Sequence, residues 1–217
     1  MSIINSSYFV SDLYLPQVGE GASSIVNNEG SLNEFITIYE PEILTYALGS
    51  KLYSEFIQHI QQNGTISASA DQKWNDLLNG IEYEKNGITH FWKGIVRPFG
   101  TFKKSFIANY VWYKYVYDSI TQHTTLGIVK ADAENSKTVS ANRRLTDVWR
   151  DMIDWYGGTI EGNSVTCFSH GNYHFEDHFN GHGNTKEVSL YTFLSDHSDN
   201  YPGWYFTPLE NKNEWGL

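Results

Sequence analysis

Two aromatic segments with helical spacing constrain the fold of this chain more than any other feature of its sequence. The first places aromatic side chains on one helical face, at Phe102, Phe106, Tyr110, Tyr113 and Tyr117. A second apolar stripe on the same segment consists of Ile107, Val111 and Tyr115. Because a helix that is apolar on two faces is not stable on the surface of a monomer, we expect it either at the centre of a helical domain or against another chain.

The second segment follows a polar connection and has the same periodicity. Its apolar positions are Leu145, Val148, Trp149, Met152, Trp155 and Tyr156, and Gly157 and Gly158 follow as a helix stop. We predict that the two helices pack against each other in the core. The expected contacts join Leu145, Trp149 and Met152 to Phe106, Tyr110 and Tyr113.

Local signals place further elements along the chain. The capping-box pattern at residues 31–34 opens a helix, Pro41 is expected to kink or restart it, and Gly49 is expected to close the next one. Alternating apolar residues around Asn86-Gly87 predict a β-hairpin near residues 81–92. Residues 8–15 have strand character, and residues 188–194 are expected to be extended.

These signals predict a mainly α fold: a helical bundle core with a small β-hairpin and extended N- and C-terminal arms. The N-terminal strand or arm is expected at residues 1–30 and the helical core domain at 31–158, with a loop at 121–140. Residues 159–217 are expected to form an extended C-terminal region that ends in a docking tail.

The net charge of −10 is unevenly distributed. Residues 1–84 hold 2 Lys+Arg and 11 Asp+Glu, residues 85–150 hold 11 and 4, and residues 151–217 hold 2 and 10. The basic centre could fold against its own acidic ends, give each subunit of a ring one positive and one negative flank, or face nucleic acid. For a DNA-binding packaging or regulatory factor, the candidate contacts are Lys103, Lys104, Arg143, Arg144 and Arg150.

A histidine series is the feature that most invites a metal site. His170, His174, His178 and His182 recur every four residues, so on a helix they would share one face and a pair could chelate zinc in a metal-dependent enzyme. Interspersed Gly and Asn disfavour that helix, which favours a polar loop instead. No phosphate loop, dinucleotide fingerprint or Gly-x-Ser-x-Gly elbow occurs in the sequence. We therefore expect no catalytic residue, no metal and no cofactor.

Six stretches of the chain carry a resemblance to a known protein family. They read FITIYEPEILTYALGSKLYSEF (35–56), WNDLLNG (74–80), FWKGIVRPFGTFKKSFIANYVWYKYV (91–116), TQHTTLGIVKA (121–131), VWRDMIDWY (148–156) and YPGWYFTPLENKNEWGL (201–217). In their order they resemble virion proteins of tailed phages that infect Bacteroidetes, including crAss-like phages, interpreted as head-tail connector or adaptor ring proteins. The histidine series lies outside these stretches.

The resemblance implies a structural virion protein rather than an enzyme: a subunit of a homo-oligomeric ring, of twelve subunits, that joins the portal and head to the tail. The implied partners are the portal protein and other tail ring proteins, and DNA passes through the lumen without sequence-specific binding. The implied location is the head-tail junction, after assembly in the host cytoplasm. No uncharged apolar window reaches membrane-spanning length, so we expect no membrane contact. The residues expected at subunit interfaces are Trp112, Tyr115, Arg143, Arg144, Tyr201, Trp204, Tyr205, Phe206 and Trp215.

Overall fold

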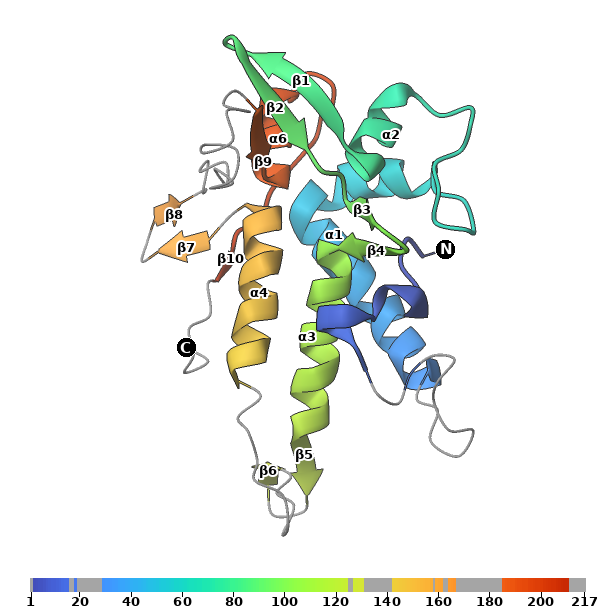
Figure 1. The fold of residues 1–217 in the computed structure, drawn as a ribbon, viewed down its shortest axis with the longest axis vertical. Helices are drawn as coiled ribbons and strands as arrows, with labels where there is room; N and C mark the ends of the chain where they lie inside the picture. The colour runs from blue at the N-terminus through green and yellow to red at the C-terminus, as the bar shows by residue number, and fades with distance from the viewer. Residues whose placement is uncertain are drawn as a thin grey trace.

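The computed structural model describes residues 2–15, 18, 29–124, 127–130, 142–157, 159–161, 164–166 and 185–210 (Figure 1). Its α-helices are α1 (Glu29–Ile57), α2 (Gln72–Asn79), α3 (Phe106–Ile120), α4 (Asn142–Tyr156) and α6 (Leu190–Asp196). Two short 3-10 helices precede them, η1 (Ser6–Tyr8) and η2 (Ser11–Leu13). The strands are β1 (Ile81–Lys85), β2 (Ile88–Trp92), β3 (Val96–Phe99), β4 (Phe102–Ser105), β5 (Thr121–Thr124), β6 (Gly127–Lys130), β7 (Thr159–Glu161), β8 (Ser164–Thr166), β9 (Thr185–Val188) and β10 (Leu209–Glu210).

The strands form small sheets around the helices. One sheet has the order β1-β2-β9 and another β10-β7-β8, while β3-β4 and β5-β6 are two-stranded. The β1–β2 hairpin turns at Asn86-Gly87, where the sequence predicts it. β9 pairs in parallel with β2, and β10 in parallel with β7. The expectation of a mainly α-helical bundle is therefore wrong, and the fold is mixed α and β. The parallel pairs join segments far apart in the chain, which local periodicity does not reveal.

Helix α3 occupies the centre of the molecule, between α1 and α4 (Figure 1). The two apolar stripes of α3 thus find partners within the same chain. Trp149 is 4% exposed and its ring centroid lies 4.6 Å from that of Tyr113 and 6.0 Å from that of Tyr110. Leu145 and Met152 are also buried. The predicted contact between these two helices is confirmed.

Some local expectations are wrong. Helix α1 continues through Pro41 instead of kinking or restarting there. It is interrupted by a kink at Gly49, at φ 77° and ψ 154°, where the sequence predicts that a helix closes. Residues 8–15, expected as a strand, form parts of η1 and η2 instead. Residues 188–194, expected to be extended, end β9 and begin α6, because the Ser189 side chain accepts a hydrogen bond from Thr192 N and caps that helix.

Two segments without long regular elements pack on this frame. The N-terminal segment, Ser2–Leu15, buries apolar side chains against the core, namely Ile3, Ile4, Tyr8, Phe9, Leu13 and Leu15. The C-terminal segment, Tyr201–Glu210, runs past the kink of α1. Tyr205 N donates to Leu48 O at 3.2 Å and Thr207 N donates to Tyr46 O at 2.8 Å. The described part of the expected docking tail therefore packs on its own chain. Docking of the tail on another subunit stays a prediction.

None of the helices in the described part of the chain is long and apolar enough to cross a membrane.

Candidate functional site

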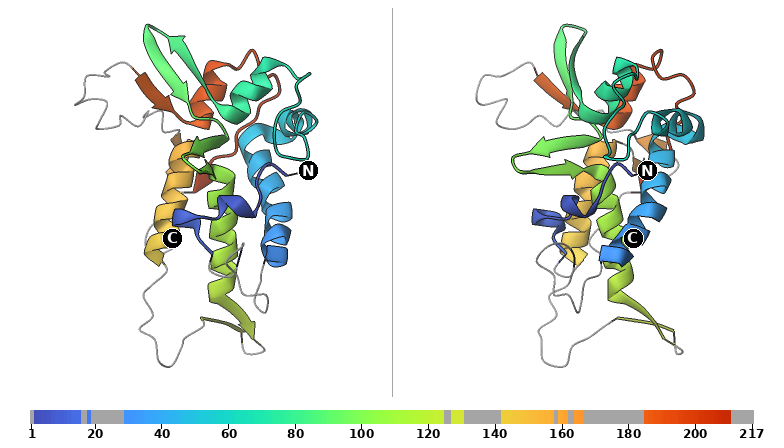
Figure 2. Two further views of the ribbon diagram at one scale, coloured as in Figure 1. Left: turned by 45° about the vertical axis from the view of Figure 1, so that its right-hand side comes forward. Right: turned by 90° about the vertical axis from the view of Figure 1, so that its right-hand side faces the viewer.

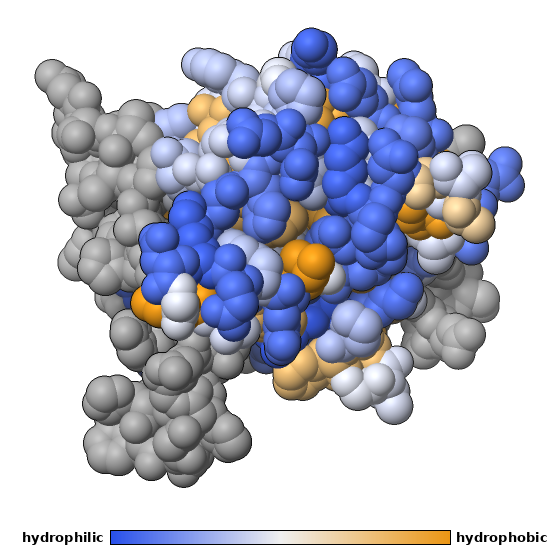
Figure 3. Space-filling model, turned by 90° about the horizontal axis from the view of Figure 1, so that it is seen from above, coloured by the Kyte–Doolittle hydropathy of each residue, from blue (hydrophilic) through white to orange (hydrophobic). Residues whose placement is uncertain are grey.

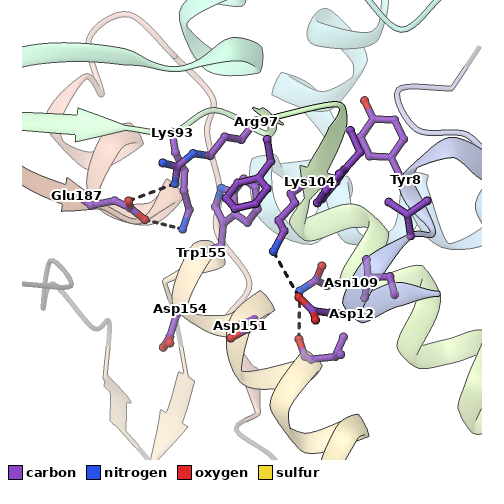
Figure 4. A pocket seen from close by; sticks show the side chains of 15 residues that line it. Tyr8, Asp12, Lys93, Arg97, Lys104, Asn109, Asp151, Asp154, Trp155 and Glu187 are labelled. Carbon is purple, nitrogen blue, oxygen red and sulfur yellow. Dashed lines mark hydrogen bonds and ion pairs between the residues drawn. The ribbon is translucent and has the colours of Figure 1, made fainter. Parts of the chain in front are cut away.

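A cleft of about 340 Å³ lies where the N-terminal segment, the β3–β4 hairpin and α4 meet (Figure 4). Its lining is mixed: Lys93, Arg97 and Lys104 carry positive charge, and aromatic side chains separate them from carboxylates. The acidic lining residues are Asp12, Asp151, Asp154 and Glu187. The cleft is the part of the described surface where the basic centre of the sequence meets its two acidic ends.

One side of the cleft is closed by an ion pair between distant parts of the chain. Lys93 Nζ lies 2.6 Å from Glu187 Oε1, and Arg97 Nη1 lies 3.5 Å from Glu187 Oε2. The Lys93 ammonium also sits 4.5 Å from the ring centroid of Trp155, whose Nε1 donates to Gly94 O at 2.8 Å. Lys93 and Glu187 are only 14% and 13% exposed, so each neutralises a charge that would be costly to bury alone. β9 brings Glu187 here by pairing with β2.

The opposite side is built around Asp12 of the N-terminal segment. Its carboxylate lies 3.4 Å from Lys104 Nζ, and its backbone oxygen accepts hydrogen bonds from Arg144 Nε at 3.2 Å and Nη2 at 2.6 Å. The carboxylate is 71% exposed, so the ion pair contributes little stability by itself. The two backbone bonds fix the end of η2 against α4.

Two carboxyls of α4, one turn apart, stand at the rim of the cleft. Partial burial raises the pKa of Asp151, and the neighbouring Asp154 carboxylate raises it further, while Lys104 opposes the shift. Partial burial also raises the pKa of Asp154, and Lys93 and Arg150 oppose that shift. These carboxyls can exchange protons with a bound ligand at less acidic pH than free aspartates.

In the described residues, no group of three or more His, Cys, Asp or Glu side chains is placed to hold a metal ion. The histidine series His170, His174, His178 and His182 lies outside the residues that the structure describes.

The interface candidates on α3 and α4 make contacts within the chain. Trp112 is 3% exposed, and the Arg144 guanidinium carbon lies 5.3 Å from its ring centroid. Tyr115 is half-buried with its ring centroid 5.2 Å from that of Phe35. Arg143 is 89% exposed on its side chain and lies near Asp147 at 4.0 Å. Their role between subunits stays a prediction, and Arg143 is the member of this set whose charge points most freely to solvent.

The interface candidates near the C-terminus also include both buried and exposed side chains. Tyr201 is 1% exposed, and Trp204 Nε1 donates to Ala47 O at 3.0 Å. The Phe206 ring centroid lies 4.5 Å from that of Tyr156 in α4. Tyr205 is 71% exposed, so its ring remains available to a partner. Trp215 lies outside the described residues.

Two of the candidate DNA contacts, Lys104 and Arg144, converge on Asp12 rather than on open solvent. Sequence reasoning missed Lys93, Arg97 and Glu187 as members of one cleft. The spacing of Lys93 and Arg97 does not predict that they share a cleft, since the chain turns at Gly94 (φ 85°) between β2 and β3. The role of Glu187 depends on a parallel strand pair that only the fold creates.

A family model described as a family of unknown function (DUF6712) matches residues 44–152, from the middle of α1 to α4. The match includes the basic side of the cleft, α3, and α4 as far as Met152. No curated protein and no solved structure matches the chain.

Proposed function

We propose a structural role for this chain, which belongs to the DUF6712 family: it is a subunit of a homo-oligomeric ring that joins the head of a tailed phage to its tail and surrounds the DNA conduit. The proposal starts from the resemblance described above to adaptor ring proteins. The twelve subunits, the portal and tail ring partners and the location at the head-tail junction follow from that resemblance. In this role the chain is not an enzyme.

The observation that carries the proposal is the placement of two hairpins at opposite ends of the molecule. In Figure 1 the β1–β2 hairpin stands at the top, and β5–β6 lies at the far end of α3 and α4. Helix α3 runs from β4, in the middle of the molecule, to β5, so its anchoring in the core holds the β5–β6 hairpin away from the body (Figure 1). A subunit of this shape can contact one neighbour above and another below while its middle packs laterally.

Both ends carry exposed charged side chains. The upper end carries exposed acidic side chains on β1, such as Glu82 and Glu84, and Asp199 after α6. Viewed from that end, the described surface is mostly hydrophilic (Figure 3). The N-terminal part of α4, at the other end, carries Arg143 and Arg144. Exposed charges at both ends suit polar contacts with neighbouring subunits during stepwise assembly.

Native mass spectrometry of the purified chain, together with electron microscopy of phage particles that contain it, tests the proposal. We expect a closed ring of one stoichiometry and density for the chain at the head-tail junction. A compact monomer within assembled particles, or a location elsewhere in the virion, would contradict it.

A further inference from the structure

The β5–β6 hairpin projects beyond the helices that carry it. In both views of Figure 2 its strands lie past the last turn of α3, at the end of the molecule away from the β1–β2 hairpin. β5 follows α3 directly, and its pairing with β6 runs from the Thr121–Lys130 pair to the Thr124–Gly127 pair. Within the described residues this sheet has two strands, so neither of its edges is covered by a further strand. An isolated two-stranded hairpin is only marginally stable in water, and more strands at its edges stabilise it.

The edges of this hairpin lack the features that usually keep a strand edge from pairing. Those features are charged side chains, proline, bulges and very short strands. β5 (TQHT) and β6 (GIVK) contain no proline and no acidic residue, and Lys130 is their one lysine. By contrast, the edge strand β1 (IEYEK) is mostly charged, and the β3–β4 hairpin contains Pro98 and three basic residues. Among the described edge strands of four or more residues, β5 and β6 are therefore the least protected.

Backbone geometry identifies the groups that each edge offers. In an antiparallel hairpin, pairs that exchange two hydrogen bonds alternate with pairs that exchange none. Thr124 and Gly127 pair at the closed end, with two residues between them, so theirs is a hydrogen-bonded pair. His123 and Ile128 form the next pair, so their backbone N–H and C=O groups point to the two uncovered edges.

We infer that β5 of one copy pairs with β6 of the next copy, so that the hairpins close into one β-barrel shared by all subunits. This inference rests on the proposed ring and gives its subunits a specific lateral contact. Rotation about the ring axis gives every β5 one direction and every β6 the opposite one, so the strands that meet between copies are antiparallel. The barrel thus continues the pairing of the hairpin itself, and its closure leaves no free edge.

A second copy fits these edges better than a single foreign strand does. A foreign strand would cover one edge and leave the other exposed, whereas identical hairpins side by side cover both. Each copy adds two strands, and about 16 strands already enclose an aqueous channel in known barrels, so roughly eight or more copies would leave an open lumen. An open lumen is what the proposed DNA conduit requires.

Proline substitution at the outward-pointing amides tests this pairing. His123→Pro and Ile128→Pro each remove a donor at an uncovered edge but no hydrogen bond within the hairpin. Sedimentation velocity over a concentration series should show self-association weakened by about tenfold or more in each variant, because an acceptor on the neighbouring copy loses its partner. Circular dichroism of each variant checks that the chain still folds.

Glu84→Pro is the matched control. Glu84 occupies in the β1–β2 hairpin the position that His123 occupies in β5–β6, one pair before a two-residue turn and on an edge strand. Its N–H therefore also points to an uncovered edge. The substitution should leave self-association of the purified chain unchanged, because β1 takes no part in the barrel.

Hydrogen exchange provides the decisive measurement, because it reports on the backbone amides themselves. The amides of His123 and Ile128 should exchange at least about tenfold more slowly in the assembled protein than in the dilute chain, while the Glu84 amide should exchange equally fast in both. Unchanged exchange on assembly, or rings that persist in both β5–β6 proline variants, would overturn the barrel and leave the ring proposal intact. A wild-type chain that stays monomeric at every concentration would overturn both. Protection that appears in phage particles but not in the purified ring would overturn the barrel and assign the hairpin edges to an axial partner.

Discussion

The N-terminal and C-terminal segments are both held against α1, but by different physical means. The N-terminal segment is attached around one buried carboxylate. Glu40, 3% exposed, accepts hydrogen bonds from Ile3 N at 2.8 Å, Ile4 N at 3.1 Å and Ser2 Oγ at 2.8 Å. Burial is the largest effect on the pKa of Glu40 and raises it, and these hydrogen bonds oppose the shift.

The C-terminal segment is attached through many neutral groups. At the kink of α1 it supplies donors to three successive carbonyls that a helix end leaves without intrahelical partners, those of Tyr46, Ala47 and Leu48. Further along, Trp149 Nε1 donates to Glu210 O at 2.9 Å and Tyr156 Oη to Thr207 O at 2.5 Å. One substitution, at Glu40, can therefore loosen the first residues of the N-terminal segment, while its buried apolar side chains still hold the remainder. The C-terminal segment is held by several separate hydrogen bonds.

Trp149→Ala should have the largest effect, because Trp149 belongs both to the packing of α3 on α4 and to the attachment of the C-terminal segment. We expect a loss of about 3 to 5 kcal/mol in the free energy of unfolding, measured by urea denaturation. Trp149→Phe is the control that keeps most of the ring burial and removes the hydrogen bond to Glu210. An alanine variant with an unchanged unfolding midpoint would show that Trp149 is not an anchor.

Gly49→Ala should come next, because the new methyl group meets the C-terminal segment directly. A Cβ at Gly49 would lie 2.8 Å from Tyr205 Cβ and 3.0 Å from Tyr205 N, in a backbone conformation with φ +77°. We expect a loss of about 3 kcal/mol, from backbone strain and displacement of the segment. Gly87→Ala is the matched control. Because Gly87 has φ +75° and a Cβ there would meet no atom within 4 Å, this variant should lose only the free energy of backbone strain. Equal losses in the two variants would mean that the segment does not press on Gly49.

Glu40→Ala should be the intermediate case and should act on the N-terminal segment alone. It leaves the N–H groups of Ile3 and Ile4 without their acceptor, at a cost of about 2 kcal/mol. Hydrogen exchange should show faster exchange at these two amides and little change at Tyr205 N and Thr207 N. Equal acceleration of exchange in both segments would contradict the expectation that Glu40 holds the N-terminal segment alone.

The smallest expected effect is a pH dependence of stability. It arises from Glu40, which attaches the N-terminal segment, and so distinguishes this attachment from the neutral one of the C-terminal segment. Because burial raises the pKa of Glu40 in the folded state, the folded protein binds more protons than the unfolded chain between the ordinary glutamate pKa and the raised one. Stability from this group is therefore complete below the ordinary pKa and is lost as the pH rises through the raised value, by at most about 1.4 kcal/mol per pH unit.

Glu40→Gln should remove this slope, as measured by urea denaturation from acidic to neutral pH. Asp151 and Asp154 also have raised pKa values and contribute in the same direction, so the difference between the wild type and the Gln variant isolates Glu40. Parallel pH profiles for the two proteins would show that Glu40 does not titrate in this range.

Only part of the cleft could be read from the sequence. Trp155 follows from the helical period of α4, which predicts that its side chain points inward. The ion pair of Lys93 with Glu187 joins residues 94 positions apart and has no local signal. Asp12 reaches the cleft because η2 packs beside α4, although residues 8–15 carry the alternation of a strand. Tertiary contacts overrode that local preference.

The sequence by itself determined the two aromatic helices, their mutual packing through Trp149, and the β1–β2 hairpin, because each depends on side-chain periodicity or turn chemistry within a short stretch. Only the tertiary structure decided that α1 continues through Pro41, that β9 and β10 complete sheets begun by distant strands, and that the C-terminal segment caps the kink at Gly49. In each of these features, burial and hydrogen bonds with residues far along the chain outweigh a local conformational preference. Such a balance is set by the whole fold, since each partner arrives at its place only when the other elements have packed.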